Sequence, residues 1–224
     1  NMFPEIIENI TRIFSITIET LHNICDGDYL SFPTRIANMF LSLMDKSLTN
    51  FVDIFNQPEI EIPLQHAYSW LMDLTITPFD EFIQESCYTV WMNSYNKILR
   101  NKVNPDTQSI FATFMPPLRK AIICSFPQPY KIVSYIDEFD NEIRVFQSQT
   151  TSNHYTIVRD CFVFLSNTDP EDTINSLNER LDQCDSLSVE DIQRLGYSIA
   201  ATVGCFSDEI ENVSIFHIIQ RYFA

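Results

Sequence analysis

Residues 78–100 read PFDEFIQESCYTVWMNSYNKILR, and this stretch carries the clearest fold signal in the chain. A proline opens it, which suits the first position of a helix because the missing N–H has no partner there. Apolar and small side chains then recur every three or four residues, the period of one helix face. They are Phe79, Phe82, Ile83, Ser86, Cys87, Val90, Trp91, Ser94 and Ile98. The pattern predicts an amphipathic helix whose face packs in a core, and this is favoured over an aromatic ligand box.

The same pattern continues on both sides of this stretch, with further helix-start signals. Prolines also precede apolar runs at positions 63, 105 and 170, and Thr77, Asn104 and Asp169 are suitable N-caps. Ser188-Val-Glu-Asp191 has the form of a capping box. Pro116-Pro117 should kink or split the helix that contains it. The predicted helices cover residues 3–24, 33–55, 62–75, 78–100, 106–125, 153–167, 170–183, 188–203 and 208–223.

Residues 130–147 break the helical pattern. They read YKIVSYIDEFDNEIRVFQ, in which two runs of β-favouring residues flank a polar turn. The turn carries four acids, Asp137, Glu138, Asp140 and Glu142. The segment therefore predicts an inserted β-hairpin with an acidic tip. Because a two-stranded hairpin is marginal alone, we expect it to lie against the concave face of the helical array or a bound partner.

Composition supports an all-α fold. The 224 residues are 45% hydrophobic and include only three glycines, whereas phosphate-binding loops and tight βα turns need glycine for its positive φ. Antiparallel helix pairs of about 40 residues with short loops are typical of HEAT repeats, which stack because no pair buries its own face. The predicted fold is thus an all-α HEAT-repeat solenoid of about four to five helix pairs with the hairpin inserted near 130–147.

Charge and cysteine usage narrow the possible partners. Thirty acids against 14 bases give a net charge of −16, which disfavours nucleic acid as a direct partner. The acidity either keeps the protein soluble or steers a basic protein partner. Six scattered cysteines indicate reduced thiols of a nuclear or cytosolic protein. No apolar run reaches the ~20 residues that span a bilayer, so no membrane association is expected.

No catalytic or metal-binding motif stands out in the sequence. None of the four histidines pairs with a cysteine or another histidine at a convincing metal-ligand spacing. The chain contains no nucleophile elbow, P-loop or dinucleotide fingerprint. We therefore expect a binding protein with no cofactor, no metal and no catalytic residues, rather than an enzyme.

Short motifs in the second half of the chain occur in an order that points to a known family. They are Pro129-Tyr-Lys-Ile-Val, Arg159-Asp160, Phe164-Leu-Ser-Asn-Thr-Asp169, Asp172-Thr173, Leu177-Asn-Glu-Arg-Leu181, Gly204 and Ser207-Asp-Glu209. In this order they resemble the exportins for leucine-rich signals, members of the importin-β karyopherin family. Residues 64–71 and 82–95 are similar to the paired helices that precede the hairpin in that family.

The resemblance implies a nuclear export receptor that shuttles between nucleus and cytoplasm. Its implied partners are GTP-bound Ran, cargo proteins with leucine-rich export signals, and nuclear pore proteins. The acidic hairpin tip would meet basic surface on Ran or on the receptor's concave wall. Residues 1–224 are then expected to be one solenoid section of a larger receptor, cut at both ends.

The resemblance also places an export-signal groove at the last predicted helix, lined by Ile219 and Phe223 with Ile215 and Tyr222. Val213, Phe216 and Ile218 are expected to pack that helix on its own repeat. A following repeat that covers Ile219 and Phe223 is the alternative. A structural HEAT-repeat scaffold or adaptor subunit is the alternative for the whole protein, although such a scaffold has no evident use for an inserted hairpin.

Overall fold

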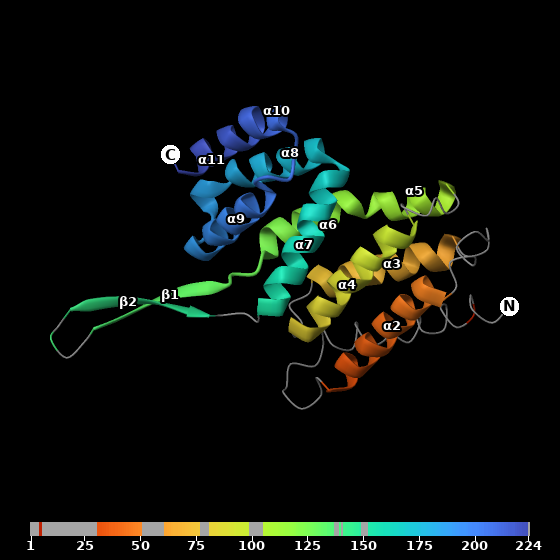
Figure 1. Cartoon of the computed structure of the whole chain (residues 1–224). Helices are drawn as coiled ribbons and strands as arrows, with labels where there is room; N and C mark the ends of the chain where they lie inside the picture. Colours follow the sequence, from red (N-terminus) through yellow and green to blue (C-terminus); the bar gives the residue numbers. More distant parts are fainter. Residues whose placement is uncertain are drawn as a thin grey trace. The chain divides into compact units, whose positions relative to one another are not determined.

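The computed structural model of the chain describes residues 5, 31–50, 61–76, 81–98, 105–136, 139, 141–148 and 152–223. These residues are mostly helical, as the periodicity predicts (Figure 1). They belong to two compact units, Asn1–Leu118 and Arg119–Ala224, and each unit is described by itself. The predicted helix at 3–24 lies outside the described residues, apart from residue 5.

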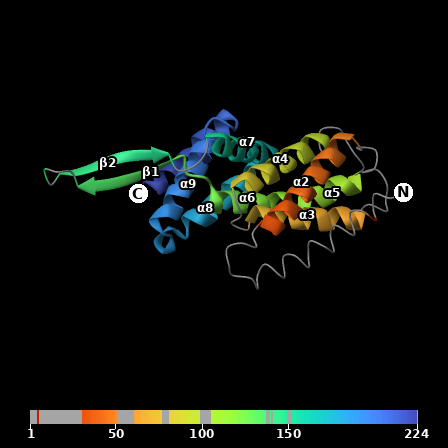
Figure 2. The ribbon, with the colours of Figure 1, turned by 90° about the horizontal axis from the view of Figure 1, so that it is seen from below.

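The first unit contains four helices in its described part: α2 (Ser31–Asn50), α3 (Glu61–Ile76), α4 (Glu81–Ile98) and α5 (Pro105–Thr113). Helix α4 packs against α2, α3 and α5, and α3 also packs against α5. The three helices α2, α3 and α4 can be followed in Figure 2, and α4 contacts both α2 and α3. The predicted ranges 33–55, 62–75 and 78–100 agree with these helices over the described residues.

Stacked aromatic side chains form the centre of the first unit. The rings of Tyr68 and Trp91 stack with their centroids 5.5 Å apart, and Phe111 meets Tyr68 edge-on at 5.2 Å. Trp91 donates its indole N–H to the Thr75 hydroxyl at 3.0 Å, so the one polar group of that ring is satisfied. Core packing of α4 is therefore confirmed for most of its predicted face, but Phe82 is 71% exposed and does not belong to the core.

The predicted break at the proline pair is confirmed. Helix α5 ends at Thr113 and α6 (Met115–Ser125) begins two residues later, with Phe114 between them. Pro116 and Pro117 have no N–H to donate to the carbonyls one turn earlier, so the ladder cannot run through them. The Phe114 N–H instead closes a tight turn onto the Phe111 carbonyl at 3.1 Å.

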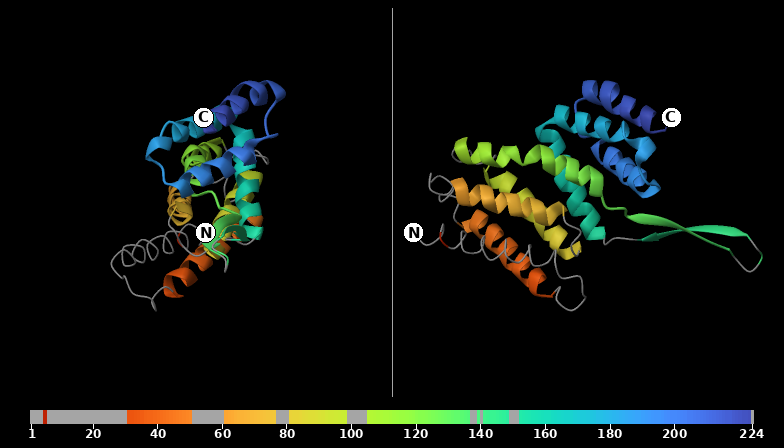
Figure 3. Two further views of the ribbon diagram at one scale, coloured as in Figure 1. Left: turned by 90° about the vertical axis from the view of Figure 1, so that its left-hand side faces the viewer. Right: turned by 180° about the vertical axis from the view of Figure 1, so that it is seen from behind.

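The second unit contains the end of α6 and the helices α7 (Ser152–Thr168), α8 (Pro170–Leu181) and α9 (Val189–Thr202), with a short 3-10 turn at Cys184–Ser186. A final helical segment follows: α10 (Asp208–Ile210), a π turn η5 (Glu211–Ile215) and α11 (Phe216–Tyr222). Helices α7, α8 and α9 pack against one another, and α11 packs against α8 and α9 (Figure 3).

Local capping explains where α8 and α9 begin. The Asp169 carboxylate accepts from the Asp172 N–H at 3.0 Å, with Pro170 at the first helical position. The Ser188 hydroxyl accepts from the Asp191 N–H at 3.1 Å. Each cap satisfies a donor that the helix itself cannot use. Both predicted caps are confirmed, whereas Thr77 and Asn104 lie outside the described residues.

A buried arginine ties three helices of the second unit together. Arg119 of α6 is 1% exposed, and its Nε donates to the Leu165 carbonyl near the end of α7 at 3.1 Å. Its guanidinium also pairs with the Asp172 carboxylate in the first turn of α8 at 2.6 Å. The cation thus meets the negative end of one helix and an acid of the next, which offsets its desolvation.

Residues between α6 and α7 form a two-stranded antiparallel ribbon. Strand β1 (Tyr130–Ile136) pairs with β2 (Glu142–Ser148) in a register that sets Tyr130 opposite Ser148 and Ile136 opposite Glu142. Figure 1 shows the ribbon extending away from the helices of the second unit rather than lying along them. Three of the four predicted tip acids, Asp137, Glu138 and Asp140, lie outside the described residues, and Glu142 is the first residue of β2.

Candidate functional site

The final helical segment of the second unit, residues 208–222, is the element to which the sequence assigns a groove. A tight connection delivers the chain to it from α9. Gly204 has φ 82°, a left-handed conformation that glycine adopts without strain. The Glu211 carboxylate accepts from the N–H groups of Gly204 at 3.0 Å and Phe206 at 3.1 Å, and so fixes this connection to the segment.

One side of the segment is fully used in packing. Ile215 and Ile218 are 1% and 0% exposed. The Tyr222 hydroxyl donates to the Ile192 carbonyl of α9 at 3.0 Å, and its ring lies over Gly196, where a Cβ would come within 2.4 Å of the hydroxyl oxygen. Glycine is therefore required in the middle of α9 for this close approach, and burial raises the pKa of the Tyr222 phenol.

Arg221 adds a polar attachment of the same segment to α8. Its guanidinium donates to the Asn178 side-chain oxygen at 2.7 Å and pairs with the Asp182 carboxylate beyond the end of α8. The segment is thus held by an apolar side, a phenol and a guanidinium. These buried and bonded groups fix the orientation of the segment on α8 and α9. The exposed side chains of the segment are not needed for that packing.

A neighbouring side of the segment exposes large apolar side chains to solvent. Val213, Phe216 and Phe223 are 68%, 55% and 79% exposed, and Ile219 is partly exposed. Phe216, Ile219 and Phe223 have the spacing i, i+3, i+7, so they follow one another along one side of α11. We call these four residues the outer apolar surface. The Tyr222 ring meets the Phe223 ring edge-on at 5.1 Å and so supports one end of this surface.

The structure corrects the sequence prediction in two respects. Ile215 cannot line an outer groove, because it is buried in the packing of the segment on the second unit. Val213 and Phe216, expected to pack with Ile218, are exposed instead. The reason is geometric: Phe216 and Ile218 are two residues apart, about 200° around a helix of 3.6 residues per turn, and cannot share a face. Ile219 and Phe223 do lie on the exposed side, while Tyr222 mainly contacts α9.

A π turn at Glu211–Ile215 further changes which residues face outward. Its i→i+5 hydrogen bonds add a residue to the turn, so the helix faces before and after it are out of step with a uniform 3.6 period. Such turns are frequent at functional sites. The sequence prediction assumed a regular helix over 208–223, and a π turn within that range shifts the faces that a regular helix would have.

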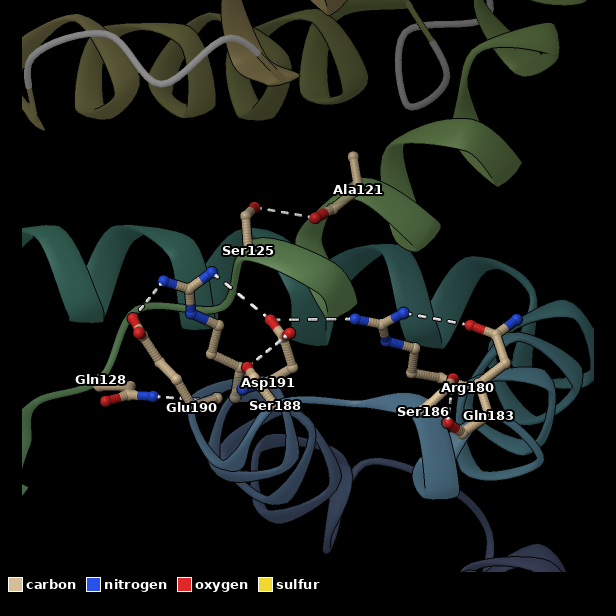
Figure 4. A network of polar contacts seen from close by, with 10 residues as sticks. Ala121, Ser125, Gln128, Arg180, Gln183, Ser186, Ser188, Glu190 and Asp191 are labelled. Atoms are coloured by element: carbon tan, nitrogen blue, oxygen red, sulfur yellow. Dashed lines mark hydrogen bonds and ion pairs between the residues drawn. The ribbon is translucent and has the colours of Figure 1, made fainter.

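A second polar cluster lies at the start of α9 (Figure 4). The Ser188 hydroxyl donates to the Asp191 carboxylate at 2.7 Å, and Arg180 and Arg194 approach the other oxygen of that carboxylate to 3.9 Å. The hydroxyl bond, followed by the two guanidinium charges, lowers the pKa of Asp191. Gln128, just before the ribbon, donates to the Glu190 carbonyl at 3.0 Å. The capping-box motif in the sequence pointed to Ser188, but no sequence motif pointed to Gln128.

Metal-ligating side chains and thiols were compared over the described residues. Over those ranges, no three His, Cys, Asp or Glu side chains gather as a possible metal site. The thiols of Cys87 and Cys161 are buried, which raises the pKa of each to about 12, far above that of a reactive cysteine. In the part of the chain that the structure describes, no helix is both long and apolar enough to cross a membrane.

Comparison with known proteins gives no family assignment. No protein-family model matches the chain, and no curated protein matches it significantly. The outer apolar surface and the ribbon therefore have to be interpreted from their own chemistry.

Proposed function

We propose that this chain is a protein-binding section of a nuclear export receptor, built as a HEAT-type solenoid and related to exportin one, which carries leucine-rich export signals. The observation that carries the proposal is the outer apolar surface. It stays exposed on a helix that is already packed on the second unit through other residues. The pairwise packing of α7, α8, α9 and α11 is what a stacked repeat requires. The inserted ribbon favours this receptor over a plain scaffold.

The proposed ligand of the outer apolar surface is an amphipathic export-signal peptide. Such a peptide presents apolar anchors at i, i+3 and i+4 spacing and needs a matching stripe of apolar side chains. Phe216, Ile219 and Phe223 provide one wall of that kind. Phe223 is the best candidate for an anchoring contact, because it is the most exposed of the three and is supported by Tyr222.

We predict that Phe223→Ala in the full-length protein weakens binding of a fluorescent leucine-rich signal peptide, measured by anisotropy with GTP-bound Ran present. The expected loss is about 1–3 kcal/mol, a ~5- to 150-fold rise in Kd. Thermal stability should change little, because four fifths of the side chain is already in water. Phe82→Ala is the matched control, since Phe82 is 71% exposed in the first unit.

Two outcomes would count against this proposal. An unchanged Kd for Phe223→Ala would remove Phe223 from the ligand surface. A loss of about 3–5 kcal/mol in stability with no change in peptide binding would mean that a following part of the protein covers Phe223 as core.

We also propose that the acidic hairpin tip takes part in the encounter with Ran. Neutralising Asp137, Glu138, Asp140 and Glu142 to Asn or Gln in the full-length protein should slow association with GTP-bound Ran and flatten its salt dependence, because exposed charges act mainly on the on-rate. Stopped-flow association at two salt concentrations measures both effects. The control neutralises four exposed acids of the second unit, namely Glu171, Asp185, Asp208 and Glu209. Equal effects in both variants would reduce the role of the tip to general acidity.

A further inference from the structure

The chain reaches the β-ribbon through a short, stiff segment, Phe126–Pro129. Phe126 is fully buried, and its ring meets Tyr155 and Phe162 of α7 edge-on at 6.0 and 5.8 Å. Two prolines, Pro127 and Pro129, follow at alternate positions. Each restricts its own φ and biases the preceding residue to extended backbone, so the segment has few ways to bend. The first strand begins at the next residue, Tyr130.

Gln128 lies between the two prolines and is only 8% exposed. Its amide nitrogen Nε2 donates to the Glu190 carbonyl, in the first turn of α9, at 3.0 Å (Figure 4). Glutamine is rarely buried unless its amide is satisfied, so this side chain is held by the bond rather than by apolar packing alone. The contact joins residues 62 positions apart in the chain.

The acceptor of this bond belongs to a helix start that is itself firmly held. Ser188 caps α9, and its hydroxyl also donates to the Asp191 carboxylate at 2.7 Å. Arg194 bonds the Glu190 side chain at 2.6 Å and approaches Asp191. Arg180 brings the end of α8 to the same carboxylate. The Glu190 carbonyl is therefore a fixed point of the second unit.

We propose that Gln128 is a positioning residue that sets the direction in which the β-ribbon leaves the second unit. Phe126 alone gives the chain one fixed point, about which the stiff segment can pivot. The bond to Glu190 adds a second fixed point two residues later and removes that freedom. The direction of the ribbon is thereby coupled to the first turn of α9, and the coupling is reciprocal: a partner that turns the ribbon also perturbs that turn. This inference does not depend on the proposed export function.

Distance measurement by pulsed electron paramagnetic resonance tests the inference on the whole chain. Nitroxide labels are attached to a keto amino acid at positions 136 and 175, because Cys124 is exposed and would react with thiol labels. Ile136 ends β1 and is 70% exposed, and Asn175 is exposed on α8. We expect Gln128→Ala to raise the population outside the main distance peak roughly 2- to 10-fold, the effect of losing one hydrogen bond.

Three further variants separate anchoring from general loss of order. Gln128→Glu, an acceptor without a donor, should broaden the distribution at least as much as Gln128→Ala. Gln128→Lys restores a donor with sufficient reach and should return the distribution toward the wild type. Gln220→Ala, the same change at an exposed position of α11, should have no effect. The inference is overturned if Gln128→Ala leaves the distribution unchanged, if Gln220→Ala broadens it equally, or if Gln128→Lys is as broad as Gln128→Ala.

Discussion

The two units of this molecule both contain packed aromatic rings, but they differ in the polar links that join their helices. In the first unit, Tyr68, Trp91 and Phe111 meet ring to ring across α3, α4 and α5. In the second unit, Phe126 also meets Tyr155 and Phe162 ring to ring, but arginines add links from helix to helix, with Arg119 inside and Arg221 at the edge. Ring packing depends on volume and is indifferent to charge, whereas an arginine link depends on a carboxylate partner. The units should therefore respond to different perturbations.

Each unit contains a buried thiol, so the local stability of the two units can be compared in one protein. Cys87 lies in α4 of the first unit and Cys161 in α7 of the second, and both are buried. Because a thiol reacts only when its surroundings open, the labelling rate of each cysteine reports the opening free energy of its own unit. Peptide mass spectrometry then distinguishes the two sites in one sample.

The largest effect is expected for Phe111→Ala. Phe111 is 0% exposed and its ring contacts both Tyr68 and Trp91, so the change leaves a cavity beside this stacked pair. We predict a loss of about 3–5 kcal/mol in unfolding free energy. The labelling rate of Cys87 should then rise by a factor of roughly 100 or more. A smaller acceleration at Cys87 than at Cys161 would contradict the assignment of this cluster to the core of the first unit.

Arg119→Met tests the second unit with a smaller expected effect. The methionine keeps the apolar stem but removes the bonds to Leu165 and Asp172. We predict a loss of about 2–3 kcal/mol, at or below the low end for breaking a buried pair, because the Asp172 side chain is 28% exposed and can be hydrated. Labelling of Cys161 should accelerate accordingly.

The neighbouring residue supplies a matched control for this change. Lys120 also pairs with an acid of α8, Glu179, at 2.8 Å, but both side chains are more than half exposed. Lys120→Met should therefore leave the labelling rate of Cys161 close to that of the wild type. If Lys120→Met and Arg119→Met had equal effects, the burial of Arg119 would carry no special weight in the second unit.

Local features of the structure could be predicted from the sequence, and long-range partners could not. Asp169 with Pro170 and Ser188 with Asp191 fix where α8 and α9 begin, because a cap and its target are three residues apart. The proline pair after Phe114 likewise acts on its own turn. By contrast, the partners of Arg119 lie 46 and 53 residues further along the chain, and no local pattern identifies them.

The candidate site shows the same limit. The spacing of four places Ile219 and Phe223 on one side of the last helix, and their role as groove residues stays a prediction. Ile215 was misplaced because apolar character alone does not say which side of a helix faces the core, and the π turn at 211–215 has no sequence signal of its own. Residue type does not show whether a phenylalanine such as Phe216 is exposed or buried. Its exposure depends on how the whole unit packs.

The smallest expected effect concerns pH and the start of α9. The Ser188 hydroxyl first, and then the Arg180 and Arg194 charges, lower the pKa of Asp191. A carboxyl whose pKa is lower in the folded state binds protons more readily when unfolded. Its contribution to stability is thus present above the unfolded-state pKa of about 4 and is lost as the pH falls through the folded-state value. Because Asp191 is partly exposed, this contribution is small beside those of Phe111 and Arg119.

We predict that Ser188→Ala reduces the dependence of stability on pH between about 5.5 and 3.5, in addition to the loss of about 1 kcal/mol expected for an N-cap. Removing the hydroxyl removes the main cause of the lowered pKa, so the folded and unfolded values converge. Urea titrations followed by Cys161 protection at the two pH values give the slope of stability against pH for each variant. The contributions of the other carboxylates cancel in the difference between variants.

Ser186→Ala, in the same loop, should keep the wild-type slope, because the Ser186 hydroxyl bonds only the Gln183 carbonyl among the contacts seen. Equal slopes for wild type and Ser188→Ala would show that the Asp191 cluster holds α9 through its geometry rather than through the charge of Asp191.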